Sequence, residues 1–170
     1  MNIRRFLCVA LLAAAPATCG LAAGESTVVV AGSQPVSQAE LDRGRYLVRV
    51  GGCNDCHTAG YVADYGGVPE QDWLLGDDTA FVGRWGTTFA TNLRLTMLRY
   101  NDEQWLARAR TLETRAPMPA ERLQTMSDAD LLSVLRYVQW LGPKGEPSPQ
   151  PLPPGDSWVG STVLYTPATP

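Results

Sequence analysis

The sequence has no apolar run long enough to cross a membrane. Its longest run covers residues 6–15, whereas a transmembrane helix needs roughly 20 apolar residues. The run follows a basic segment, residues 2–5, and precedes small residues that extend to Ala23, which is the pattern of an export signal. We therefore expect a signal peptide over residues 1–23, cleaved after Ala17 or Ala23, a bacterial periplasmic location, and no transmembrane segment.

Positive charge is scarce as well. The chain has 14 Lys and Arg against 17 Asp and Glu, and removal of Arg4 and Arg5 with the signal leaves 12 against 17, a net charge of −5. Binding to nucleic acid is not expected, because it depends on clustered Lys and Arg that neutralise phosphates. The expected partners are proteins with a positive docking surface, or uncharged small molecules.

Cysteine is another scarce residue, and two of the four cysteines lie within the signal. Cleavage after Ala23 removes both of them. Cleavage after Ala17 would retain Cys19, and a lipid anchor at Cys19 is a weaker alternative because Pro16 and Thr18 fit a lipoprotein signal poorly. The two remaining cysteines lie further along the chain, in a compartment that oxidises thiols.

Composition divides the rest of the chain into three parts. Residues 24–36 are rich in Gly, Ser, Val and Gln and form a leader, and residues 37–142 form one compact domain. Residues 143–170 hold eight of the thirteen prolines, which forbids a helix or a central strand and predicts an extended tail. Such a tail is either a tether for a partner or a solvated segment without a role.

Helical periodicity and capping residues predict three helices in the domain. They cover residues 37–50, 101–112 and 127–142, and the first two begin with capping boxes. Residues 58–100 are rich in glycine and have little periodicity, so they are predicted to form a long loop region. A loop of this length needs a hydrophobic surface on which to pack.

One motif carries the chemistry: Cys53-Asn54-Asp55-Cys56-His57. Two thiols on one turn of backbone can reach both vinyl groups of one porphyrin, and the imidazole of the next residue can then bind the iron. The pattern predicts one covalent haem c attached to Cys53 and Cys56, with His57 as an axial ligand of the iron.

Three other interpretations compete with a haem. A thioredoxin-like pair normally follows a strand, but the segment before Cys53 is predicted to be a helix. A zinc site needs four ligands, and Cys53, Cys56 and His57 supply only three nearly consecutive ones. A simple disulfide would leave His57 without a role.

The second axial ligand cannot be histidine, because the chain contains only one. Met118 lies between Pro117 and Pro119, in a loop between the second and third predicted helices, and the two prolines restrict the backbone that presents it. We therefore predict Met118 as the ligand. Met97 is the reserve, although core packing also explains it, and Met126 is expected to pack at the start of the third helix.

The sequence resembles the class I c-type cytochromes of bacteria, which carry one haem, and the haem domains of cytochrome subunits that serve membrane-linked dehydrogenases. The resemblance covers about residues 38–142. It is carried by the haem motif, by Pro117-Met118-Pro119, and by the segments 44–48, 86–92 and 127–137. The dehydrogenase subunits usually carry three such motifs and this chain has one, so a free or loosely docked carrier is expected.

This resemblance implies an all-α fold, in which the first and last helices cross around one covalent haem and a long glycine-rich loop region completes the domain. It implies that Gly44 allows a close approach to the face of Tyr137. It also implies that His57 and Met118 are the axial ligands.

The expected function is electron transfer rather than enzymatic catalysis. His/Met ligation fills both axial sites and leaves no place for a substrate. The carrier would shuttle single electrons between a dehydrogenase or respiratory complex and its acceptor, with a membrane-associated dehydrogenase or oxidase as its partner. A haem enzyme or gas sensor with an open sixth site is the first alternative, and a structural or assembly subunit is the second.

Two further sets of residues have open roles. Trp85 and Asn92 are expected either to lie against the haem and its propionates or to serve in loop packing and turn capping. Five arginines are expected on the solvated surface, with a propionate contact as the alternative for one of them; these are Arg94, Arg99, Arg108, Arg110 and Arg115.

Overall fold

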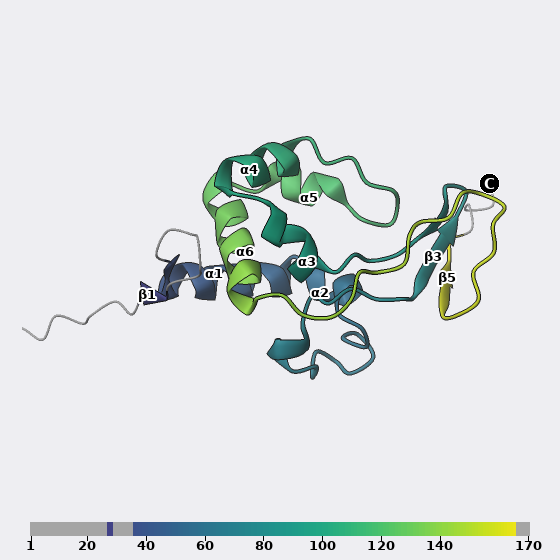
Figure 1. Cartoon of the computed structure of the whole chain (residues 1–170), viewed down its shortest axis with the longest axis horizontal. Helices are drawn as coiled ribbons and strands as arrows, with labels where there is room; N and C mark the ends of the chain where they lie inside the picture. The colour runs from purple at the N-terminus through teal and green to yellow at the C-terminus, as the bar shows by residue number, and fades with distance from the viewer. Residues whose placement is uncertain (1–26, 29–35, 166–170) are drawn as a thin grey trace, which may run out of the picture.

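The computed structural model describes residues 27–28 and 36–165 (Figure 1). The predicted signal peptide, with Cys8 and Cys19, lies outside the described residues, and so does most of the predicted leader. Within the described part of the chain, no helix combines the length and apolar character needed to cross a membrane.

Three longer helices lie together in Figure 1: α1 (Gln38–Val50), α4 (Asp102–Arg110) and α6 (Asp128–Leu141). Their bounds confirm the three predicted helices to within two residues at each end. Both predicted capping boxes are present, so the first amides of α1 and α4 find side-chain acceptors.

Helices α1 and α6 cross at a glycine (Figure 1). A Cβ atom at Gly44 would lie 2.5 Å from the Cβ of Tyr137 and would overlap the carbonyl oxygen of Ser133. Only a residue without a side chain fits between these two backbones. The close approach of Gly44 and Tyr137 is thereby confirmed.

The hydrophobic core lies among these three helices and the segment that follows α2. Its largest buried members are Leu47, Val48, Trp73, Leu74, Met97, Trp105, Leu131, Leu135, Tyr137 and Val138. The buried indole of Trp105 donates its Nε1–H to the carbonyl oxygen of Leu131 at 2.8 Å, so this buried donor has a hydrogen-bond partner.

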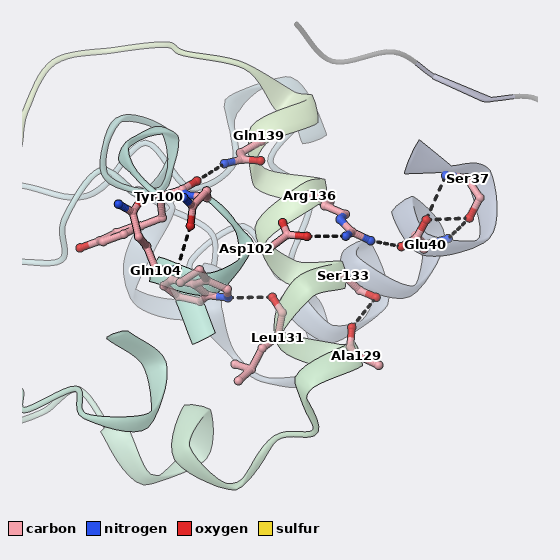
Figure 2. A network of polar contacts seen from close by, with 12 residues as sticks. Ser37, Glu40, Tyr100, Asp102, Gln104, Ala129, Leu131, Ser133, Arg136 and Gln139 are labelled. Carbon is pink, nitrogen blue, oxygen red and sulfur yellow. Dashed lines mark hydrogen bonds and ion pairs between the residues drawn. The ribbon is translucent and has the colours of Figure 1, made fainter. Parts of the chain in front are cut away.

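Polar side chains join the same helices at their surface (Figure 2). The guanidinium of Arg136, on α6, donates to Glu40 of α1 and, at 2.6 Å, to Asp102 of α4. About one turn further along α6, Gln139 donates to the carbonyl oxygen of Tyr100 at 2.9 Å (Figure 2). These contacts hold α1, α4 and the segment before α4 against α6.

Short helices connect the longer elements. They are α2 (Cys53–His57), α3 (Leu93–Thr96), α5 (Ala120–Thr125) and two 3-10 turns, η1 (Glu70–Asp72) and η2 (Met97–Arg99). Several of these lie within residues 58–100, so the region predicted to be a long loop contains regular structure.

Two small sheets make the prediction of an all-α fold wrong; the chain has a mixed α/β fold. Strands β1 (Thr27–Val28) and β2 (Val36–Ser37) pair antiparallel. A three-stranded sheet has the order β4-β3-β5, in which β3 (Ala80–Gly83) pairs antiparallel with β4 (Gly86–Thr88) and parallel with β5 (Thr162–Leu164).

The larger sheet escaped the sequence analysis because β3 and β4 form a very short hairpin and the third strand, β5, comes from far along the chain. Strand β5 belongs to the proline-rich tail, and its backbone bonds join it to β3 from the other end of the chain: Ala80 N–H donates to Ser161 at 2.8 Å, and Tyr165 N–H donates to Val82 at 2.8 Å. Short strands without alternating polarity carry no periodic signal of their own. The described tail residues are therefore bonded to the domain, although most of their side chains are exposed to solvent.

Candidate functional site

The predicted haem motif forms helix α2, a single turn that begins after two glycines. Gly52, the residue before it, has a left-handed backbone with φ of 71°, which a glycine adopts without steric cost. Cys53 and Cys56 lie three positions apart on α2, so their side chains share one face of the turn. Both are half-buried and carry free thiols.

The surroundings keep the two thiols protonated. Burial raises the pKa of the Cys53 thiol to about 11. Burial also raises the pKa of Cys56, and the negative charges of Asp55 and Asp77 add to this effect. An environment that favours neutral thiols is also compatible with uncharged thioethers.

His57 is buried and its tautomer is set by one hydrogen bond. Its Nδ1 lies 2.8 Å from the carbonyl oxygen of Thr91. Since a carbonyl oxygen can only accept, Nδ1 carries the proton and Nε2 keeps its lone pair. The residue is 9% exposed, and burial lowers its pKa against the opposing effect of the Thr91 bond. The imidazole is therefore neutral and oriented, as a metal ligand must be.

Buried hydrogen bonds anchor α2 to the segment that follows it. The fully buried Asn54 accepts from the hydroxyl of Thr58 at 2.8 Å, and that hydroxyl accepts from the Leu74 N–H at 2.8 Å. The N–H of Gly76 donates to the carbonyl oxygen of His57 at 2.8 Å. These bonds fix the single turn that presents the two thiols and the imidazole.

Met118 lies half-buried in the loop between α4 and α5. Its carbonyl oxygen accepts from the hydroxyl of Thr114 at 2.7 Å and from the N–H of Ala120 at 3.1 Å. Two residues earlier, the carbonyl oxygen of Ala116 accepts from the hydroxyl of Thr88 at 2.9 Å. The loop that presents Met118 is thus held both internally and by β4.

The other two methionines have structural surroundings. Met97 is 2% exposed and belongs to the hydrophobic core, which is the core role weighed for it above. Met126 packs against the core directly before Ser127, the N-cap of α6, which confirms its expected place at the start of that helix.

Residues 86–94, here called the connecting segment, link the two parts of the site. The carbonyl of Thr91 holds His57, and the hydroxyl of Thr88 holds the backbone two residues before Met118. Both threonines lie in the segment 86–92 that carries the resemblance, but the sequence assigned neither of them a role, because a backbone carbonyl can come from any residue type and an isolated hydroxyl has no spacing signal.

Asn92 caps a helix and Trp85 packs in the loop region, while a contact of either residue with haem stays a prediction. The side-chain oxygen of Asn92 accepts from the Leu95 N–H at 3.1 Å as the N-cap of α3, while its Nδ2 donates to the carbonyl oxygens of Lys144 and Glu146 at 2.8 and 3.1 Å. The ring of Trp85 packs on Tyr165, with 5.6 Å between ring centroids.

The expected solvated position is wrong for Arg94, which is 5% exposed. Its guanidinium donates to the carbonyl oxygens of Gly142 at 2.5 Å, Gln71 at 2.8 Å and Leu141. The last carbonyls of a helix have no partners within the helix, and Arg94 supplies donors to the end of α6.

The donor set fits a covalent haem: two neutral thiols on one helical turn, and beside them a neutral imidazole whose Nε2 is free to bind iron. Among the described residues, no three His, Cys, Asp or Glu side chains are arranged to hold a metal ion between them; a haem iron takes only one protein ligand on each face. Comparisons with protein-family models, with curated proteins and with solved structures gave no match to this chain.

Proposed function

We propose that this chain is an exported electron-transfer protein, akin to the class I c-type cytochromes, with one haem c bonded to Cys53 and Cys56. The observation that carries the proposal is the state of His57: the Thr91 carbonyl fixes the proton on Nδ1 and leaves Nε2 free, directly after two protonated thiols on one turn. The bound haem would supply one-electron chemistry at its iron.

The residues that would hold the haem favour electron transfer over catalysis. The Thr91 carbonyl orients the imidazole of His57 and increases its basicity. Met118 is the proposed second ligand, and its neutral sulfur favours the reduced iron and raises the reduction potential. If His57 and Met118 both bound the iron, no site for a substrate would remain there, which supports a carrier rather than an enzyme.

Covalent attachment is the first test. Acid–acetone extraction should leave all colour with the polypeptide, and the intact mass should exceed that of the processed chain by one haem. Cys53→Ala and Cys56→Ala should each impair maturation, because each removes one thioether. Asp55→Asn keeps both thiols and the imidazole and serves as the matched control. A colourless wild-type protein, or one with two haems, would reject the proposal.

The sixth ligand can be tested separately. The ferric protein should show the weak long-wavelength charge-transfer band of sulfur bound to iron. Met118→Ala should abolish this band and lower the reduction potential, whereas Met126→Ala should keep it. Met97→Ala should keep the band while it lowers the free energy of unfolding by about 3 kcal/mol, the usual cost of truncating a core side chain. Loss of the band in Met97→Ala but not in Met118→Ala would show that the Met118 assignment is wrong.

The net charge of the exported chain supports a partner with a positive docking surface, for which we propose a membrane-associated dehydrogenase or terminal oxidase that faces the periplasm. Transient redox contacts of this kind depend on charge complementarity for their association rate. The rate of electron transfer to an isolated partner should fall as salt rises from about 10 to 150 mM, because the Debye length shrinks from roughly 30 to 8 Å. A rate that does not change with salt would reject an electrostatic contact.

A further inference from the structure

We propose that the C-terminal segment, residues 143–165, is a strap that positions both proposed axial ligands by fixing the connecting segment, residues 86–94. The inference rests on the proposed function where it concerns iron ligation. The strap and the connecting segment run beside each other between the helices and the β3–β5 pair in Figure 1.

Hydrogen bonds from the strap reach the connecting segment at three successive places. Leu152 and Thr87 exchange backbone N–H···O bonds of 2.9 and 3.0 Å. The hydroxyl of Ser148 donates to the carbonyl oxygen of Ala90 at 2.8 Å. Asn92 donates to two strap carbonyls near the end of α6. The strap is thus bonded to Thr87, which precedes Thr88, and to Ala90 and Asn92, which lie on either side of Thr91.

Aromatic packing and close backbone contacts add to these bonds. Trp158 of the strap packs edge-on against the buried Phe89, with 4.7 Å between ring centroids. Gly86 lies so close to the strap that a Cβ atom there would be 2.8 Å from the carbonyl carbon of Pro153. Gly76, whose N–H holds the carbonyl of His57, has no room for a Cβ beside Ser148. The strap therefore packs against the connecting segment and against Gly76, which is bonded to the carbonyl oxygen of His57.

Two residues of the connecting segment, Thr88 and Thr91, lie between these contacts and are bonded to the Met118 loop and to His57, respectively. The carbonyl oxygen of Thr91 accepts from Nδ1 of His57, and the hydroxyl of Thr88 donates to the carbonyl oxygen of Ala116 in the Met118 loop. The strap contacts the neighbours of these two threonines, which are Thr87, Phe89, Ala90 and Asn92. A shift of the strap would therefore move both the Thr91 carbonyl, which accepts from His57, and the Thr88 hydroxyl, which donates to the Met118 loop. The strap residues are accordingly positioning residues: they touch neither proposed ligand and act through residues 88 and 91.

The only histidine of the chain offers a direct readout. In protein labelled with ¹⁵N-histidine, the reduced wild type should show one protonated Nδ1 that exchanges slowly with solvent. Ser148→Ala should speed this exchange roughly fivefold, the effect of losing a bond worth about 1 kcal/mol. Trp158→Ala should speed it by about tenfold or more, since an aromatic pair contributes about 1 kcal/mol beyond the area that it buries. Val159→Ala, next to Trp158 but 94% exposed, should leave it unchanged.

A second control separates positioning from general loss of stability. Arg136→Gln weakens the contacts among α1, α4 and α6 without touching the strap, so it should lower the unfolding temperature and leave His57 exchange at the wild-type rate. Thr88→Val removes the bond to Ala116 and should weaken the sulfur–iron band while His57 exchange stays the same. Equal exchange rates in Ser148→Ala, Trp158→Ala and Val159→Ala would overturn the strap proposal.

Failure of the strap and failure of the proposed function are distinguishable. If the purified wild-type protein carries no haem, the proposed function fails, and the ¹⁵N-histidine comparison still decides whether the strap positions His57. If haem and the sulfur–iron band are present but the strap variants match Val159→Ala, the function stands and the strap proposal is rejected.

Discussion

The helical part of the molecule and the part built from the sheet and the strap are stabilised in different ways. Helices α1, α4 and α6 are joined by a shared apolar core, by backbone contact at Gly44 and by the ion pairs of Arg136. The connecting segment and the strap have few core members; backbone hydrogen bonds and aromatic pairs such as Phe89–Trp158 hold them together.

This difference has a functional consequence. All four proposed haem-binding side chains lie outside the three long helices, on the single turn of α2 and in the loop before α5. The helices hold the core, whereas hydrogen bonds from the connecting segment reach His57 and the loop that contains Met118. Damage to the helical part should therefore reduce stability first, and damage to the strap should change the site first.

The largest loss of stability is expected from Gly44→Ala. The added Cβ would overlap the Ser133 carbonyl and approach Tyr137 Cβ to 2.5 Å, so α1 and α6 must separate. We expect the free energy of unfolding to fall by about 3 kcal/mol, at the upper end for overpacking, as measured by urea titration. Val50→Ala, at an exposed position of the same helix, should change it little. A Gly44→Ala protein as stable as the wild type would show that the crossing is looser than described.

An intermediate effect is expected from Arg94→Met, which tests the boundary between the two parts. The substitution keeps an unbranched side chain but removes the donors to the carbonyls at the end of α6. We expect a loss of about 2 kcal/mol, because hydrogen bonds from a charged group are lost at a buried site. Arg99→Met, at an exposed position, should cost far less in the same thermal or urea unfolding experiment. Equal effects of the two substitutions would contradict the buried role of Arg94.

The smallest effect concerns Glu40 and has a defined pH dependence. Burial acts to raise its pKa, but hydrogen bonds from Ser37 and the charge of Arg136 outweigh burial and lower the pKa below the ordinary 4.5. Since the folded pKa lies below the unfolded one, the stabilisation is present above about pH 4.5 and is lost as pH falls through the folded pKa.

Glu40→Gln should therefore cost about 0.5 kcal/mol at pH 7, a value reduced by the partial exposure of the carboxylate, and should cost less as the solution is acidified. Urea titrations of both proteins between pH 3 and pH 7 measure the difference. Glu113→Gln, at an exposed loop position, is the control. A difference that stays constant over this range would exclude the Arg136 contact as its cause.

The sequence by itself determined the helical part and indicated the residues of the candidate site. Capping boxes and apolar periodicity are local properties, so they located α1, α4 and α6, and the spacing of Cys53, Cys56 and His57 indicated which atoms a haem would need. The glycine at the helix crossing was also expected, from the resemblance to class I c-type cytochromes.

Only the tertiary structure decided the rest. The pairing of β3 with β5, the burial of Arg94 and the docking of the strap all depend on pairs of residues far apart in the chain. A backbone carbonyl such as that of Thr91 has no signature in the residue type that carries it. Local propensity cannot encode such contacts, because their energy is gained only when segments that are distant in the sequence meet. The proline-rich tail was expected to be extended; the fold determined what it lies against.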